Sequence, residues 1–316
     1  NISELATTVF EYVEKDVADN ISNHMALLHY LNKAGNIKTY DGGSTIRQEL
    51  DYQENGTYKR YRGWERLNIS PQKVLSAAEY DPVQIAIAVA ISGLEQLQNS
   101  GKSRILDLLE HRIRNMRTSY LNNLSADLYS AGTAYQQIGG FQHIIADSPG
   151  SNVVGGISDS TWTFWQNFAV DATSDLGAAA TSSNIQGYMT HMIINLTRGS
   201  DSPSAIFADN NYWKLYHDSL QAIQRITDMK AKSGWKELDY MQMPVVLDGG
   251  KGGQCPTNHM YFPNLDYLFW RPHTNRNFKQ IGKNRESIDQ DGFVRIFGTL
   301  AQLTCSNRSL QGVLKD

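Results

Sequence analysis

Residues 44–69 read STIRQELDYQENGTYKRYRGWERLNI, and this stretch decides the fold. Its first part, 44–52, alternates in the way that a strand does, so that every second side chain lies on one face. Its second part, 57–69, is rich in aromatic and β-compatible residues. Asn55-Gly56 lies between them, and Asn-Gly is the strongest short-range hairpin signal because both residues tolerate positive φ. The sequence therefore predicts a long β-hairpin within residues 41–76.

The returning strand of this hairpin carries aromatic and cationic side chains. A two-stranded hairpin is marginally stable in water, and no third strand is visible in the adjacent sequence. We therefore expect the hairpin to lie on another surface, either that of its own domain or that of a neighbouring molecule. The candidate contact residues are Tyr58, Lys59, Arg60, Tyr61, Arg62 and Trp64.

A strand and a long helix follow the hairpin. Residues 79–91, EYDPVQIAIAVAI, alternate between large aliphatic side chains and small ones, which predicts a half-buried strand. Residues 103–129 place an apolar residue at every third or fourth position, which predicts an amphipathic helix. At about 1.5 Å per residue this helix is roughly 40 Å long, more than most globular helices need.

The remainder of the chain divides into a mixed middle and a β-rich end. Leu5, Val9, Val13 and Val17 form a weak amphipathic pattern, and residues 25–31 suggest a short helix. Residues 205–208 read as a buried strand that runs into a capping cluster at 209–211 and a helix to about residue 226. A strand-like run covers 293–314. Because strands flank the helical middle, we expect the two ends of the chain to share one sheet, with a second subdomain inserted between them.

Composition excludes several classes of protein. The 316 residues are 41% hydrophobic and 19% charged, which is ordinary for a folded globular chain. The net charge of −3 gives no sign of tight binding to nucleic acid or to an anionic membrane. No apolar run approaches the roughly 20 residues that span a bilayer. Cys255 and Cys305 are fifty residues apart and form no metal-binding pair, so we interpret them as ordinary thiols.

Enzyme motifs are missing from the sequence. The eight histidines are scattered and include no H-x-x-x-H pair, and there is no G-x-S-x-G motif. The best phosphate-loop candidate is the Gly-rich segment 248–254, DGGKGGQ, which lacks the spacing of a P-loop. We therefore predict no catalytic residue, metal or cofactor. The alternative is a soluble α/β enzyme with a degenerate phosphate-binding loop at 248–254.

The order of these segments resembles that of the major capsid proteins of tailed bacteriophages, whose fold is named after the phage Hong Kong 97. The resemblance rests on the hairpin, the strand ending in ISGLEQL at 91–97, the long helix ending in LYSAGT at 128–133, and the stretches CPTNHMY at 255–261 and SNRSLQGVL at 306–314. It covers essentially the whole chain. It implies an α+β fold and a structural role without enzymatic activity.

The resemblance also implies a division of the chain. Residues 1–40 would be an N-terminal arm, 41–76 an extended β-hairpin loop lying across a neighbouring subunit, and 77–146 a peripheral domain with its spine helix at 103–129. Residues 147–260 would form an axial domain, and 261–316 would be strands that return to the peripheral domain.

Partners and location follow from the same resemblance. It implies self-assembly into hexamers and pentamers of an icosahedral shell around double-stranded DNA, which the shell would contact weakly. It further implies scaffold, portal and decoration proteins, no membrane, and a place in the virion capsid after assembly in the bacterial cytoplasm. No scaffolding segment is recognisable at the start of the chain, so a separate scaffold protein and prior cleavage both remain open. Some relatives cross-link this loop through a Lys–Asn bond; Lys59 is the only lysine in residues 41–72, and no partner is matched by motif.

Overall fold

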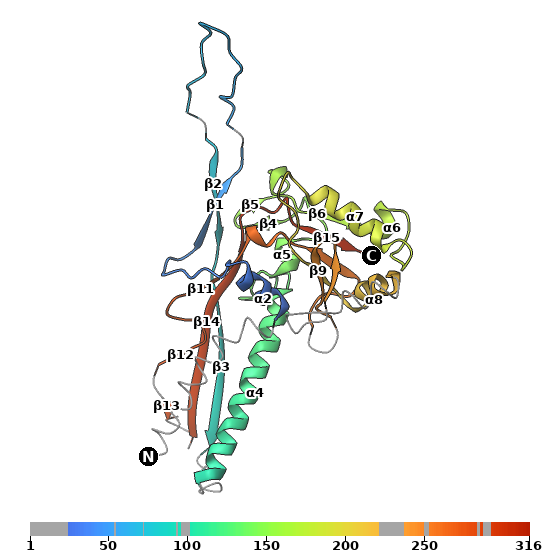
Figure 1. The fold of residues 1–316 in the computed structure, drawn as a ribbon. Helices are drawn as coiled ribbons and strands as arrows, with labels where there is room; N and C mark the ends of the chain where they lie inside the picture. Colours follow the sequence, from blue (N-terminus) through green and yellow to red (C-terminus); the bar gives the residue numbers. More distant parts are fainter. Residues whose placement is uncertain are drawn as a thin grey trace.

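The computed structural model describes residues 25–53, 55–71, 73–92, 94–95, 102–220, 237–249, 253–282, 285–286 and 292–316. For residues 102–110, 237, 285–286 and 293 it describes the backbone alone. The described part is elongated, with one sheet in the lower half of Figure 1, a second sheet at the upper right, and an extended loop projecting above both. The predicted amphipathic pattern from Leu5 to Val17 lies outside the described residues.

The lower sheet is built around one long strand, β14 (Gly292–Cys305). On one side β14 pairs antiparallel with β3 (Val83–Ser92) along the whole of that strand. On its other side it pairs with three shorter strands. These are β11 (Leu268–Pro272), β12 (Lys279–Gln280) and β13 (Arg285–Glu286).

The helix α4 (Lys102–Leu128) lies along β3 (Figure 1) and confirms the helix expected at 103–129. Its described apolar side chains that recur every three or four residues are buried: Ile113, Met116, Tyr120, Leu124 and Leu128. The Tyr120 hydroxyl and the Thr299 hydroxyl of β14 are 2.6 Å apart, so a hydrogen bond joins the helix to the central strand. The apolar stripe that the sequence predicts is thus the face by which α4 covers the sheet.

The second sheet has six strands in the order β6-β15-β10-β7-β9-β8. Their bounds are β6 Phe168–Asp171, β15 Gly312–Lys315, β10 His259–Phe262, β7 Ile206–Ala208, β9 Met243–Leu247 and β8 Glu237–Tyr240. Two helices, α7 (Ile185–Leu196) and α8 (Asn210–Ser219), pack on this sheet beside the short α6 (Ala172–Asp175). The Asp209 carboxylate accepts a hydrogen bond from the Tyr212 N–H, which confirms the predicted cap of α8. The helix ends at Ser219, where Leu220 is already extended, so the expectation that it continues to about residue 226 is wrong.

Smaller elements connect the two sheets. They are α2 (Ala26–Lys33), α5 (Phe141–Ile144), β4 (Val153–Val154), β5 (Ile157–Ser158), and the 3₁₀ helices η1 (Thr163–Trp165) and η2 (Leu265–Tyr267). α2 confirms the short helix that the sequence suggests after residue 24. Its apolar side chains belong to the same buried cluster as β3, α4 and β14, so this part of the expected arm packs on its own chain.

The hairpin prediction is wrong in its returning strand. β1 (Ile46–Asp51) pairs antiparallel with β2 (Leu75–Tyr80) and not with residues 57–69. The paired part is confined to β1 and β2, where side chains are buried against the body of the chain, among them Ala78 and Tyr80 of β2. Residues 57–69 instead expose nearly every side chain, so pairing there would gain little burial.

The strand expected at 79–91 is two strands. β2 ends at Tyr80 and β3 begins at Val83, with Asp81-Pro82 between them. Proline has no N–H to donate to a ladder, so regular pairing is interrupted here and the chain passes from one sheet to the other.

Residues 261–316 are expected to return to the peripheral domain, and β11, β12, β13 and β14 do lie in one sheet with β3. The last strand, β15, does not. The run expected at 293–314 divides into β14 and β15, and β15 pairs parallel with β6 and antiparallel with β10 in the six-stranded sheet. Gln311 stabilises the turn between them, since its side chain accepts from the Asn264 N–H at 3.0 Å and donates to the Asn264 carbonyl at 3.1 Å. At Gly312 a Cβ would lie 2.4 Å from the end of the Leu196 side chain of α7, so a larger residue would force that side chain to shift.

We predict that Leu124→Ala lowers the free energy of unfolding by about 2–5 kcal/mol, because the truncated side chain leaves a cavity between α4 and the sheet. Denaturant unfolding followed by circular dichroism measures the change. Asn122→Ala, at an exposed position of the same helix, is the control and should shift the midpoint little. Equal effects of the two changes would contradict the packing described above.

Candidate functional site

The extended loop, residues 52–74, is the candidate functional surface. A backbone hydrogen bond from Tyr52 N to Val74 O, 3.1 Å long, closes its base. Beyond that bond the described residues of the loop form no backbone ladder, and the loop projects away from both sheets (Figure 1). Three residues beyond Tyr52, the Asn55 side chain accepts hydrogen bonds from the Thr57 N–H and hydroxyl. This is a local turn and not the expected reversal between two paired strands, because β1 pairs with β2.

All six predicted contact residues lie together on this loop and are exposed to solvent. Trp64 is fully exposed and Tyr58 is 82% exposed. Leu67 and Ile69 were not among the predicted contact residues, yet both are exposed, Ile69 to 90%. Their alternating positions in a stretch without charge were a signal that could have singled them out. A loop that leaves this much apolar surface in water is typical of a binding segment.

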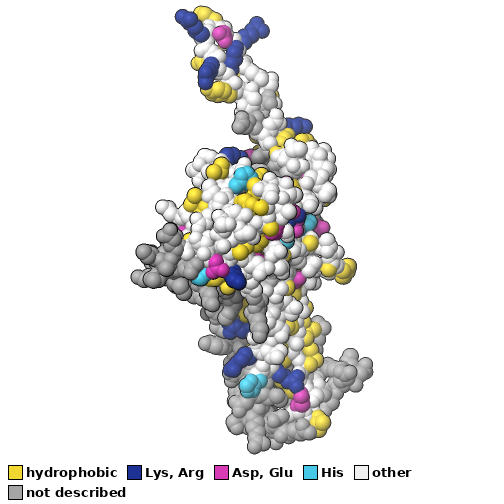
Figure 2. Space-filling view, turned by 90° about the vertical axis from the view of Figure 1, so that its right-hand side faces the viewer, with side chains coloured by type: hydrophobic (Ala, Val, Ile, Leu, Met, Phe, Trp, Pro, Cys, Tyr) yellow, Lys and Arg dark blue, Asp and Glu magenta, His cyan; other side chains and the backbone are white. Residues whose placement is uncertain are grey.

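The loop is also basic. Residues 52–74 contain five basic and two acidic residues, a net charge of +3, while the whole chain carries −3. Figure 2 shows Lys and Arg side chains together with hydrophobic ones at the tip. Lys59 has a partner inside the loop, since its Nζ lies 3.0 Å from the Glu65 carboxylate. Arg60 and Arg62 form no ion pair with any residue that the structure describes.

The base of the loop is anchored on the body of the chain. Ile46, Leu50, Ala78 and Tyr80 pack on the β4–β5 hairpin and Trp165. The Tyr80 hydroxyl donates to the Cys305 carbonyl at 3.0 Å, which ties β2 to the end of β14. Both strands of the base therefore have fixed positions, from which the loop projects.

Arg308 holds the segments around this base together. Its side chain is completely buried and donates to the Ile144 carbonyl at 2.7 Å and to the Trp165 carbonyl at 3.0 Å. It also donates to the Asn167 side chain at 3.1 Å and lies 3.4 Å from the Asp159 carboxylate. Burial lowers the pKa of this guanidinium from its ordinary value, and the Asp159 charge opposes that effect. Nothing in the sequence singles out Arg308, because its hydrogen-bond partners lie more than 140 positions away along the chain.

The Gly-rich segment does not have the geometry of a phosphate site in its described part. Its two ends close on each other, with a hydrogen bond from Cys255 N to Asp248 O, 2.9 Å long. The nearby N-terminus of α8 is already occupied by the Asp209 carboxylate, whose second oxygen accepts from the Asn258 N–H at 2.9 Å. A carboxylate at that position repels a phosphate. The enzyme alternative therefore has no support.

Other chemistry is sparse in the part of the chain that the structure describes. No group of three or more His, Cys, Asp or Glu residues there could hold a metal ion. Both cysteines are buried free thiols, and burial raises the pKa of each. No described helix is both long enough and apolar enough to cross a membrane.

His259, the first residue of β10, and Asp147 form a titratable contact. The His259 Nε2 lies 3.0 Å from the Asp147 carboxylate, and its Nδ1 lies 2.8 Å from the Thr257 carbonyl. Burial alone would lower the pKa of His259, but the hydrogen bonds that its ring donates to Asp147 and Thr257 outweigh this effect, so the pKa lies above its ordinary value. Both ring nitrogens face oxygen acceptors, which is the arrangement that an imidazolium needs.

We predict that this contact stabilises the fold at low pH. Because the folded-state pKa is raised, the stabilisation is fully present below the unfolded value near 6.5 and is lost as the pH rises through the folded value. Thermal unfolding of the wild type and of His259→Gln should therefore differ more at pH 5.5 than at pH 8.5. A difference that grows with pH would contradict the assigned charge state.

The structure has extensive similarity to capsid subunits of known structure. The cyanophage A-1(L) capsid asymmetric unit matches with a TM-score of 0.60 at 14% sequence identity, over 89% of this chain and 90% of that one. The capsid of a native GTA particle matches with a TM-score of 0.59 at 10% identity, over 90% and 89%. A virus-like particle from Pyrococcus furiosus matches with a TM-score of 0.55 at 9% identity, over 96% and 98%.

Comparison at the level of sequence finds no such relatives. No family model matches the chain, and no curated protein matches it. The similarity is therefore carried by the arrangement of the elements: the extended loop, the long helix along a sheet, and the second sheet with its helices. The chain has the Hong Kong 97-like fold of the tailed-phage capsid proteins.

Proposed function

We propose that this chain is a major capsid protein, which assembles into the hexamers and pentamers of an icosahedral shell around double-stranded DNA. The extended loop is the observation that supports this role most directly. It is long, and in a single chain it exposes both basic side chains and large apolar ones along its length. In a shell each loop would be covered by a neighbour, and repetition of the same contact around a rotation axis closes a ring.

The distribution of charge supports contact between copies. The loop carries +3, so the remainder of the chain carries −6. A basic loop is attracted to the acidic body of a neighbouring copy, and complementary charges fix the position at which the two bind. In this proposal Tyr58, Lys59, Arg60, Tyr61, Arg62 and Trp64 contact the adjacent subunit.

The remaining parts take the roles that the fold suggests. In this proposal residues 77–146, with α4, belong to the peripheral domain, and 147–260 form the axial domain around the five- and sixfold axes. β15 would join the axial sheet. The role is structural and needs no catalysis or cofactor. Scaffold, portal and decoration proteins would be further partners, and assembly would take place in the bacterial cytoplasm. The net charge of −3 fits a container that touches packaged DNA only weakly.

The direct test is assembly of the purified chain, followed by light scattering and negative-stain microscopy. Shells, or rings of five and six subunits, support the proposal. A small oligomer of fixed size that binds nucleotides would overturn it. Because two of the similar structures are described as a GTA particle and a virus-like particle, the nucleic-acid content of particles from infected cells then tests the DNA-containing role.

We predict that the triple change Lys59→Glu, Arg60→Glu and Arg62→Glu impairs assembly and leaves the monomer folded, because these side chains form no hydrogen bond or ion pair with a described residue outside the loop. Particle yield by sedimentation and the circular dichroism of the monomer measure the two effects. The matched control, Lys59→Arg with Arg60→Lys and Arg62→Lys, keeps the charge at each position. Normal particle yield from the charge-reversed chain would contradict the role of the loop.

A further inference from the structure

The outer edge of β3 is open in the described structure. β3 pairs with β14 on one side, and no described strand pairs with its other side. The edge runs the ten residues VQIAIAVAIS without a charge or a proline. Proteins usually protect such an edge with charges, prolines or a covering segment, because it is a template for another strand.

Hydrogen bonds on β14 show which backbone groups of β3 face the open side. Leu300, opposite Gln84, bonds through both its N–H and its carbonyl to residues on the far side of β14. The carbonyl of Ile296, opposite Ala88, likewise accepts from Ile281 on the far side. In an antiparallel ladder, residues whose partners bond away from them direct their own N–H and carbonyl outward.

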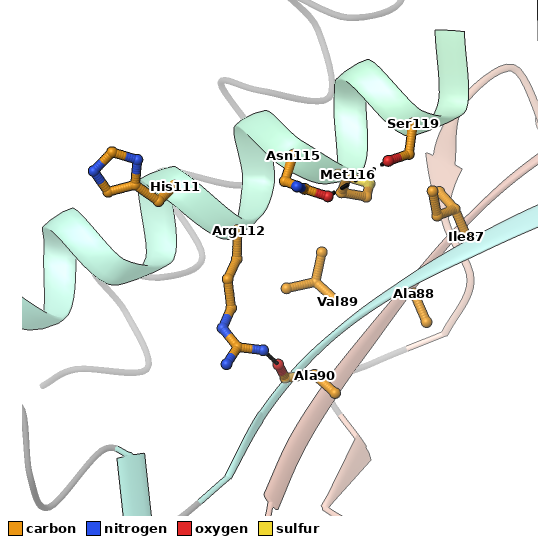
Figure 3. Close-up of a pocket in the computed structure, with 9 residues that line it drawn as sticks. All are labelled: Ile87, Ala88, Val89, Ala90, His111, Arg112, Asn115, Met116 and Ser119. Carbon is orange, nitrogen blue, oxygen red and sulfur yellow. Dashed lines mark hydrogen bonds between the residues drawn. The ribbon is translucent and has the colours of Figure 1, made fainter. Parts of the chain in front are cut away.

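One outward group already has a partner. The Arg112 guanidinium of α4 donates to the Ala90 carbonyl at 2.7 Å (Figure 3). Ala90 is two residues beyond Ala88, so its carbonyl is expected to face the open side as well. Gln84, Ala86 and Ala88 therefore present N–H and carbonyl groups along the open edge, and the side chains of these three residues are exposed.

A groove of about 410 Å³ follows this edge between β3 and α4 (Figure 3). Ile87, Val89 and Met116 line it with apolar surface. Asn115 and Ser119 add polar groups from the helix. The groove thus offers a backbone ladder on one wall and an apolar surface for alternate side chains, which is the arrangement that accepts an added strand.

Two copies of β3 do not fit edge to edge. Because α4 lies along β3, such pairing would bring two helices about one strand spacing, ~5 Å, apart, and packed helices need about 8–10 Å. The occupant is therefore a single extended segment without a helix of its own.

The extended loop contains a segment of this kind. Residues 67–70, LNIS, are uncharged, and Leu67 and Ile69 alternate and are 50% and 90% exposed. Neither residue has a backbone hydrogen bond to another described residue.

We propose that residues 67–70 of the extended loop pair with the open edge of β3 on a second copy of the chain. Leu67 and Ile69 enter the groove beside Ile87 and Val89, and Asn68 lies opposite Ala88 whichever way the segment runs. This inference rests on the proposed function, because it needs a neighbouring copy, and it assigns the loop a specific partner surface.

The test is a cysteine pair, Asn68→Cys with Ala88→Cys, in the full chain. Particles are assembled under reducing conditions and then oxidised mildly. Directly opposed residues on neighbouring strands are close enough for a disulfide, so covalent multimers should appear on non-reducing gels. The native Cys255 and Cys305 are buried and present in every variant.

The matched control is Asn68→Cys with Tyr135→Cys, because Tyr135 is 94% exposed on a different segment. Multimers from the first pair alone support the docking. Particles that form normally without the 68–88 link, or that link equally well through position 135, overturn the docking and leave the shell role intact. A chain that forms no assembly at all overturns both.

A second variant tests the backbone ladder. Ala88→Pro removes an N–H that β14 does not use, as edge strands tolerate, so the monomer should keep its melting temperature. Loss of about one hydrogen bond should raise the concentration needed for assembly by about fivefold relative to Ala88→Ser. Equal assembly of the two folded variants would overturn the ladder. If Ala88→Pro unfolds, the cysteine pair alone tests the docking, because its two substitutions leave every backbone N–H in place.

Discussion

The pairing of β14 with β3 is the constraint on which the rest of the structure depends. These strands are separated by some two hundred positions in sequence, yet their ladder runs from Val83 opposite Ala301 to Ser92 opposite Gly292. A strand of this length positions α4 over one face and carries three shorter strands on its other side. Because one continuous strand makes all of these contacts, a change of register would move every buried side chain to the wrong face.

The segment that follows β14 connects the lower sheet to the six-stranded sheet. Arg308 lies between β14 and β15 and bonds to the carbonyls of Ile144 and Trp165. Burying a guanidinium is costly unless each donor has a partner and a carboxylate balances the charge, which Asp159 does. The same region receives the Tyr80 hydroxyl at the end of β2. The base of the extended loop, the end of β14 and the start of the six-stranded sheet are therefore fixed relative to one another.

The rigid body and the exposed loop suit a subunit that is completed by its neighbours. A monomer gains nothing from a projecting loop with exposed Trp64 and Ile69, since apolar surface in water favours aggregation. In a closed assembly the same surface would be buried repeatedly, and weak contacts would add up through multiple attachment. The open edge of β3 has no described strand partner, and Leu67 and Ile69 of the loop form no backbone hydrogen bond to another described residue. Each can supply what the other lacks.

The sequence by itself determined the local elements. The periodicity of 103–129 predicted α4, the alternation after Pro82 predicted β3, and Asp209 marked the start of α8, because these signals come from residues close together in the chain. The sequence also located the exposed loop and its basic, aromatic character. Only the tertiary structure decided which strands pair, that β15 joins the second sheet, and what Arg308 binds. Those outcomes depend on burial between distant segments, and local propensity carries no information about that burial.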